Sequence, residues 1–211
     1  MKIAVVGAAG MVGSRVVAEA ARRGHAPVAV IRNGRPGAIP PGVATVHGDA
    51  NDRVRMRETF AGADAVVVAT RPVAGQEHGV AATTRALLDA AAGIGVRVLV
   101  VGGAAPLWNP AEPGRLVLDS PEYVPVPIRA VAAASVAQLA ACRDHPADWV
   151  YLSPPAVLEP GSRTGTYRRG TTTLLTDAAG HSRISAEDLA VAILDELENS
   201  LDVRHFTVGY R

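Results

Sequence analysis

The chain has 211 residues, of which 48% are hydrophobic and 19% charged, with a formal net charge of +1. Length and composition predict one globular domain, and the near-neutral charge argues against nucleic acid as the main partner. The lone Cys142 cannot form an intramolecular disulfide, and no stretch approaches the roughly 20 apolar residues that a membrane-spanning helix needs. We therefore expect a soluble, cytoplasmic monomer or homodimer that acts on a small molecule.

Short apolar segments alternate with longer alanine-rich segments along most of the chain. The first five apolar segments are nearly continuous in Val, Ile, Leu and Ala, which is typical of strands covered on both faces. Predicted strands span residues 2–6, 28–31, 43–47, 65–69, 97–101 and 149–152, and predicted helices span residues 11–23, 52–60, 77–93 and 122–143. This alternation predicts an α/β fold of Rossmann type, with a doubly wound, mainly parallel sheet.

The pattern changes after Ser153. Residues 154–170 are rich in Pro, Gly, Arg and Thr, which predicts a long ordered loop or a hairpin. Ser185, with Glu187 and Asp188 in the turn that follows, predicts the start of a final helix, and residues 206–210 a terminal strand. We expect residues 153–211 to complete a single domain, 1–211, as a small substrate-side lobe.

The strongest local signal is the sequence GAAGMVG at residues 7–13, which follows a strand and opens a helix. Gly7 suits a tight turn, Gly10 allows a pyrophosphate to approach the backbone, and Gly13 allows the helix to pack on the strand. The helix N-terminus would attract the phosphates. The alternative is a glycine-rich turn without a ligand. The expected contacts to the diphosphate come from Gly7, Ala9, Gly10, Met11 and Val12.

The end of the second strand indicates which cofactor is bound. NAD-preferring sites usually place an acidic residue about 20 residues after the glycines, yet no Asp or Glu lies between Ala20 and Gly48. Arg32 instead stands where a guanidinium would hold a 2′-phosphate, with Asn33 beside it and Arg35 near. The alternative is that both arginines are solvated loop residues. The pattern favours NADP(H).

Other candidate contacts follow later strands, at the sheet edge where ligands bind in open α/β folds. Asp49, next to Ala50, would bond the adenine amino group or else cap the following helix. The fourth and fifth strands are followed by residues that would lie along the cofactor, the second pair near the nicotinamide. These candidates are Thr70, Arg71, Gly102 and Gly103, with Pro154 after the sixth strand.

Three features of the sequence together resemble the atypical short-chain dehydrogenase/reductase superfamily. They are the glycine turn, the strand end Ile31-Arg32-Asn33 and the step Gly48-Asp49-Ala50. The nearest subgroup is the NAD(P)H-binding, NmrA-like proteins described as NADH-flavin reductases. The C-terminal third is similar as well, most diagnostically in Arg163-Thr164-Gly165. The resemblance covers nearly the whole chain and implies a Rossmann fold that binds NAD(P)H.

Typical members of that superfamily use a Tyr-x-x-x-Lys pair and a Ser, and this chain lacks them. Its one lysine is Lys2, four residues after Tyr123 comes Pro127, and glycines follow the fifth strand where the Ser would stand. A developing alkoxide would lose help worth about 10²–10⁴ in rate, whereas flavins, quinones and enones delocalise the incoming electrons. We expect an NADPH-dependent reductase of such an acceptor. The alternatives are an NADP(H)-sensing regulator and a redox-neutral epimerase or isomerase.

Few side chains are candidates for a proton donor. Ser153 ends the sixth strand, Tyr167 and Arg163 lie on the long loop expected to roof the pocket, and His78 lies near the start of the predicted helix 77–93. Each has a structural alternative, as a cap, a packing residue or a solvated side chain. Trp108 and Trp149 are expected to pack in the interior. The six histidines show no paired spacing, so we expect no metal site.

Overall fold

An eight-stranded sheet, ordered β3-β2-β1-β4-β5-β6-β10-β8, forms the centre of the molecule. The computed structural model describes residues 1–32 and 39–211. The strands are β1 (Lys2–Val6), β2 (Ala26–Ile31), β3 (Ala44–His47), β4 (Ala65–Val68), β5 (Arg97–Val101), β6 (Trp149–Ser153), β8 (Arg168–Gly170) and β10 (His205–Gly209). Every neighbouring pair is parallel except β8 with β10. A second, parallel pair joins β7 (Val157–Glu159) to β9 (Arg183–Ser185).

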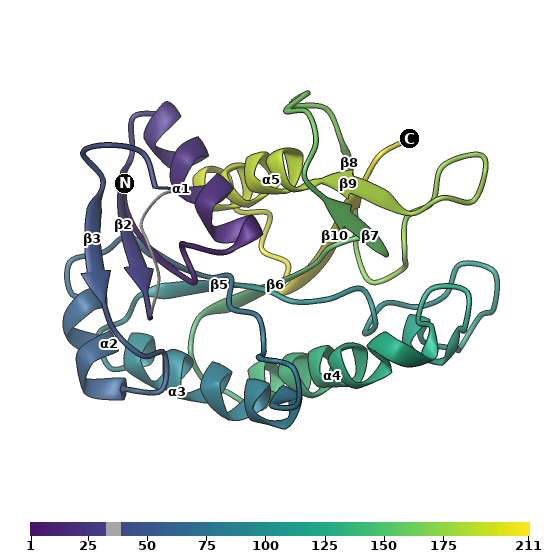
Figure 1. Cartoon of the computed structure of the whole chain (residues 1–211), viewed down its shortest axis with the longest axis horizontal. Coiled ribbons are helices and arrows are strands. Elements are labelled where there is room, and N and C mark those ends of the chain that lie inside the picture. Colours follow the sequence, from purple (N-terminus) through teal and green to yellow (C-terminus); the bar gives the residue numbers. More distant parts are fainter. Residues whose placement is uncertain (33–38) are drawn as a thin grey trace.

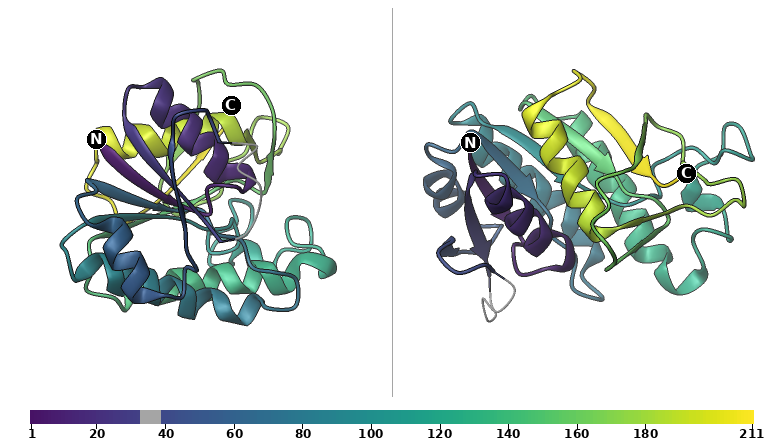
Figure 2. Two further views of the ribbon diagram at one scale, coloured as in Figure 1. Left: turned by 60° about the vertical axis from the view of Figure 1, so that its left-hand side comes forward. Right: turned by 90° about the horizontal axis from the view of Figure 1, so that it is seen from above.

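Helices cover both faces of this sheet. On one face lie α1 (Met11–Arg22) and α5 (Ala186–Glu198), and on the other lie α2 (Arg53–Phe60), α3 (Val80–Ala92) and α4 (Arg129–Arg143) (Figure 1). The turned views show α1 and α5 side by side above the strands (Figure 2). The strand order reverses between β1 and β4, and ligands of doubly wound sheets bind at the carboxyl ends of the strands there.

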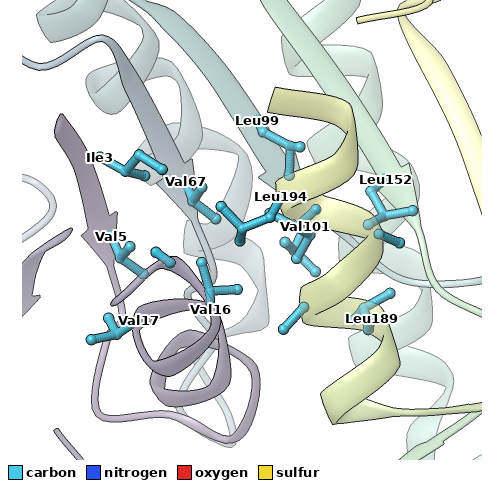
Figure 3. Close-up of a cluster of buried hydrophobic side chains, with 14 of the residues drawn as sticks. Ile3, Val5, Val16, Val17, Val67, Leu99, Val101, Leu152, Leu189 and Leu194 are labelled. Atoms are coloured by element: carbon cyan, nitrogen blue, oxygen red, sulfur yellow. The ribbon is translucent and has the colours of Figure 1, made fainter. Parts of the chain in front are cut away.

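The core on the α1–α5 face explains why these helices form. Both carry an apolar stripe at helical spacing that is removed from water only against the sheet. Figure 3 shows Val16 and Val17 of α1 and Leu189 and Leu194 of α5 directed at the strands. The strand residues that they approach are also buried, namely Val5, Val67, Leu99, Val101 and Leu152. Packing of α1 on the sheet fixes its N-terminus at the carboxyl end of β1.

The predicted alternation and sheet type are confirmed, with three local differences. β3 was expected to be covered on both faces, but it is an edge strand whose side chains are largely exposed. The helix expected from residue 122 begins as α4 at Arg129, because Pro125 and Pro127 remove backbone donors before it. Residues 154–170 do not form a hairpin, since β7 pairs with β9 and β8 pairs with β10.

The expected start of the final helix is also confirmed. The side chain of Ser185 accepts a hydrogen bond from the amide of Asp188 at 3.0 Å and so caps α5. Cys142 is fully buried in α4, and burial raises the pKa of its thiol to about 12. Over the residues that the structure describes, every helix is too short or too polar to cross a bilayer.

Candidate functional site

The turn between β1 and α1 depends on close backbone contacts. Gly7 has a φ of +85°, and a Cβ there would lie 2.6 Å from the carbonyl oxygen of Ala69, just after β4. A Cβ at Gly13 would lie 2.2 Å from the carbonyl oxygen of Gly7. Side chains at either position would separate α1 from the turn or the turn from β4. These contacts agree with the turn and packing roles that the sequence suggests for the two glycines.

The N-terminus of α1 faces the sheet edge at this turn. Gly10 is the N-cap residue, and no side chain of the described residues caps the helix there. The amide of Gly10 donates to the carbonyl oxygen of Gly7 at 2.9 Å, and Ala9, Gly10 and Met11 are exposed, with Val12 half-buried. Uncapped amides and the helix dipole attract anions. The residues present therefore fit a bound diphosphate.

Arg32 follows the last residue of β2, the neighbour of β1, and its side chain is exposed. None of the ion pairs formed among residues 1–32 and 39–211 includes Arg32. The other two residues predicted at this strand end, Asn33 and Arg35, lie outside the described residues. A cationic side chain thus stands one strand away from the glycine turn, with no acidic residue in the chain between Ala20 and Gly48.

The step after β3 tests the capping interpretation of Asp49. Its carboxylate accepts hydrogen bonds from the amide and side-chain nitrogens of Asn51, at 2.8 and 2.9 Å, and is exposed. The cap of α2 is Asp52, which accepts from the amide of Arg55 at 2.9 Å. The capping alternative for Asp49 is therefore wrong. Ala50 is partly buried against the core beneath α2 and α3.

Thr70 and Arg71 follow β4, where Ala69 already contacts Gly7, so both lie beside the turn. Thr70 is half-buried and Arg71 exposed. Pro154 is buried at the end of β6. These three positions line the same carboxyl edge of the sheet as the turn.

Packing accounts for the glycines after β5. A Cβ at Gly102 would lie 1.8 Å from the hydroxyl oxygen of Tyr151, and a Cβ at Gly103 would lie 2.9 Å from Oγ of Ser135. Tyr151 is fully buried, with its hydroxyl 3.0 Å from the carbonyl oxygen of Ser135 and 3.2 Å from Oε1 of Gln138. Glycine is thus required at both positions whether or not a nicotinamide binds beside them.

Ser153 is completely buried at the end of β6, and its Oγ lies 3.0 Å from Nε2 of His205 on β10. The imidazole of His205 meets the ring of Tyr151 edge-on, with centroids 5.4 Å apart. Burial, with a smaller effect of Arg143, lowers the pKa of His205 to about 4, so the ring is neutral at pH 7. The two residues form an uncharged pair inside the fold, and Ser153 has no exposed surface to offer an acceptor.

The hydroxyl of Tyr167 donates to Asp195 on α5 at 2.5 Å, and Asp195 also pairs with Arg23 at 2.8 Å. Burial, together with Asp195, raises the pKa of Tyr167 above its ordinary value. Arg23 follows the last residue of α1, about 18 Å along the helix axis from its N-terminus at about 1.5 Å per residue. Tyr167 is therefore bound near the C-terminal end of α1, far from the glycine turn.

His78 lies on the 3-10 turn Glu77–Gly79 that precedes α3, and its side chain is exposed. Among the described residues no hydrogen bond joins any two of Ser153, Tyr167 and His78. The fourth candidate, Arg163, forms a bidentate pair with Glu19 on α1. The structure therefore does not assemble the sequence candidates into one catalytic group.

Lys2 begins β1, and its Nζ donates to the carbonyl oxygen of Ala61 at 3.1 Å. Because the glycine turn follows the other end of β1, the one lysine of the chain lies at the opposite edge of the sheet. Tyr210 donates to Asp188 at 2.6 Å, so three of the four tyrosine hydroxyls, with those of Tyr151 and Tyr167, are engaged inside the protein. Within residues 1–32 and 39–211 no cluster of His, Cys, Asp and Glu could hold a metal ion.

Fold and turn together define a Rossmann-type dinucleotide-binding domain. Residues 7–200 match the family described as NAD(P)H-binding, and the chain belongs to that family. The uncharacterized protein YwnB of Bacillus subtilis (strain 168) is 35% identical over 203 residues, which cover 94% of this chain and 93% of YwnB. The match to the family model and the structural neighbours below support the resemblance to atypical short-chain dehydrogenases/reductases.

Two solved structures have the same architecture. SP1627 from Streptococcus pneumoniae TIGR4, provisionally named an NADH-flavin reductase, superposes with a TM-score of 0.90 at 26% identity, over 100% of both chains. A protein from Bacteroides thetaiotaomicron, provisionally named an epimerase, superposes with a TM-score of 0.88 at 36% identity, over 99% of this chain and 96% of that one. Proteins with different provisional activities therefore share this fold.

Several interacting residues were not found by sequence reasoning. Glu19 and His205 gave no signal, because an acid on a helix and a histidine before a strand are ordinarily solvated. Trp149 is 4% exposed, as expected of a packing residue, but Trp108 is 43% exposed. Its backbone bonds Thr172 and Leu174, which directs the neighbouring Leu107 inward and leaves the indole at the surface.

Proposed function

We propose that the protein is an NADPH-dependent oxidoreductase that reduces a small conjugated acceptor, such as a flavin, quinone or enone. The observation that carries this proposal is the uncapped N-terminus of α1 at the β1–β4 switch point. Backbone amides of Gly10, Met11 and Val12 would hold the diphosphate there. Asp49, whose carboxylate is exposed, would bond the adenine amino group.

Preference for NADPH over NADH rests on Arg32. A planar guanidinium binds a 2′-phosphate through charge-assisted hydrogen bonds, whereas NAD sites use an acid to bind the free 2′-hydroxyl. The chain offers the cation and no acid at this strand end. Arg35 belongs to the same proposal as a second cation.

The acceptor class follows from the residues that are absent at the sheet edge. When bound, the reduced nicotinamide supplies a hydride, and a saturated carbonyl would then need a proton from the protein. Lys2 lies at the opposite edge, and the hydroxyls of Tyr151 and Tyr167 are engaged inside the fold. Acceptors whose reduced form delocalises charge need only to be oriented and shielded from water, and solvent protonates the product.

The test is a screen of purified protein for loss of NADPH absorbance with FMN, riboflavin, quinones and simple enones, run in parallel with NADH. The expected result is turnover of at least one acceptor class with NADPH favoured. Binding of NADPH without turnover of any acceptor would contradict the reductase proposal. Turnover that favours NADH would contradict the cofactor preference alone.

A second candidate is a regulator that senses NADP(H) without turnover. The same engaged tyrosines and distant lysine favour it, because such a protein needs no proton donor. It requires NADP⁺ and NADPH to bind with different affinities, which separate binding titrations with the two forms measure. A third candidate, a redox-neutral epimerase or isomerase, is suggested by the provisional name of the Bacteroides thetaiotaomicron relative. It would show substrate conversion with no net change in NADP(H).

A further inference from the structure

Residues 161–165, expected from the sequence to roof the substrate pocket, are hydrogen-bonded to side chains of α1 and α5. The segment follows β6 and β7 in the chain, so it connects the carboxyl end of β6 to α1. Its backbone amides donate to carboxylates on α5, from Gly161 to Glu187 at 2.7 Å and from Gly165 to Asp188 at 2.8 Å. We call residues 161–165 the clamp segment.

Asp188 is the main anchor of the clamp segment on α5. It is fully buried and accepts hydrogen bonds from the amide of Thr164 at 2.8 Å and from its hydroxyl at 2.6 Å. Tyr210 adds a bond at 2.6 Å. Burial opposes ionisation of Asp188, but these donors outweigh it and lower its pKa. The carboxylate is thus charged, buried and committed to holding Thr164 and Gly165, which gives a physical reason for this motif.

Glu19 anchors the clamp segment on α1. Its side chain is 4% exposed, and both its oxygens accept from the guanidinium of Arg163, at 2.8 and 3.0 Å. Arg22 and Arg23 also bond Glu19 from within or beside the helix. Burial would disfavour the charge, yet the arginines hold the pKa of Glu19 far below its ordinary value. Arg163 is the partner that links Glu19 to another part of the chain.

From this arrangement we infer that Arg163 is a positioning residue for the cofactor. It ties α1, whose N-terminus would hold the diphosphate, to the segment that leaves the carboxyl end of β6, where the nicotinamide half would lie. A dinucleotide bound along that edge would contact the N-terminus of α1 and the residues that follow β6, so its binding and the ordering of the clamp segment would reinforce each other. This inference rests on the proposed binding of NADPH.

Coupling between cofactor binding and the ordering of the clamp segment is reciprocal, so it can be tested on the wild-type protein without any substitution. In the wild-type protein, saturating NADPH should slow hydrogen exchange at the amides of Gly161, Thr164 and Gly165. A structural role alone would leave their exchange unchanged on binding. Hydrogen exchange measures local opening of the backbone, so this test does not depend on enzymatic turnover.

Arg22 offers a matched control for substitution, because its guanidinium also forms a bidentate bond to Glu19, at 2.9 and 2.7 Å, but lies on α1 itself. Arg163→Ala should raise the Kd for NADPH by about fivefold or more, the lower range of site-to-site coupling. Arg22→Ala should change it by less than about twofold, as for an exposed ion pair. Arg163→Lys, which keeps the charge, should restore part of the affinity.

The outcomes separate this inference from the proposed function. If NADPH does not bind the wild-type protein, the proposed function fails. If NADPH binds but leaves exchange in the clamp segment unchanged, or if Arg163→Ala and Arg22→Ala weaken binding equally, the inference is overturned and the proposed function stands. Should Arg163→Ala fail to fold, the exchange measurement on wild-type protein decides.

Discussion

The hydroxyl oxygen of Tyr151 occupies the space that a side chain at position 102 would need, since a Cβ built on Gly102 would lie 1.8 Å from it. The ring cannot withdraw, because Tyr151 is fully buried and its hydroxyl is bound to Ser135 and Gln138 on α4. Close packing between the end of β5 and the side chain from β6 therefore fixes the backbone that follows β5.

Gly102→Ala should destabilise the protein by about 1–3 kcal/mol or more, the usual cost of overpacking a filled core. Urea denaturation measures the change. Gly79→Ala is the control, because a Cβ at Gly79 meets nothing within 4 Å and its φ of −77° suits alanine. Equal midpoints for the two variants would show that Tyr151 is able to move aside.

Arg32→Ala should weaken NADPH binding about tenfold or more while leaving NADH binding nearly unchanged, because only NADPH presents a phosphate to the guanidinium. Fluorescence titration with both cofactors measures this. Arg57→Ala, which removes an equally exposed cation from α2, controls for net charge. A similar loss for both cofactors would mean that Arg32 supports the fold instead of reading the 2′-phosphate.

His205 should make stability depend on pH between about 4 and about 6.5. Its pKa is near 4 in the folded protein and ordinarily 6.5, so over this interval the unfolded chain binds more protons. The contribution of the neutral His205 ring to stability is therefore fully present above pH 6.5 and is lost as the pH falls toward about 4. His205→Gln should flatten the difference between denaturation midpoints at pH 4.5 and 7, chosen roughly to bracket the interval. His47→Gln, at an exposed edge position, should retain it.

Asp52→Ala should cost about 1 kcal/mol, because the amide of Arg55 loses its cap. Asp49→Ala should cost less, since the helix keeps its cap, and should instead weaken cofactor binding if Asp49 holds the adenine. Thermal denaturation and NADPH titration of the two variants distinguish these effects. A larger loss of stability from Asp49→Ala would contradict the assignment of the cap.

The order of strands and helices, the glycine turn and the Ser185 cap could be predicted from sequence because each depends on neighbouring residues. Alternating apolar segments fix the layers, and Gly13 packs against the carbonyl oxygen of Gly7 within the same turn. The partners of Ser153, Tyr167 and Arg163 could not be predicted, since His205, Asp195 and Glu19 come from distant parts of the chain. The same limit applies to Gly102, whose constraint is Tyr151 on the next strand.

The clamp segment likewise shows why the prediction that residues 156–170 roof the pocket could not be decided from composition. Loops rich in Pro, Gly and Thr are solvated by default, and nothing local reveals that Thr164 and Gly165 face a buried carboxylate. Asp188 was noted as a first-turn acid of a helix, which is its ordinary electrostatic role. Here its side chain also accepts hydrogen bonds from the amides of Thr164 and Gly165, which lie 24 and 23 residues earlier in the chain.

The position of β10 between β6 and β8 has a consequence for biosynthesis. β10 follows β6 and β8 in the chain and yet lies between them in the sheet, and α5, which precedes β10, packs beside α1. Until both have been synthesised, the apolar stripe of α1 lacks its partner and β6 has an open edge that invites pairing with other chains. The sheet is therefore completed only after β10 has emerged from the ribosome, and chains truncated before β10 should be recovered as aggregates.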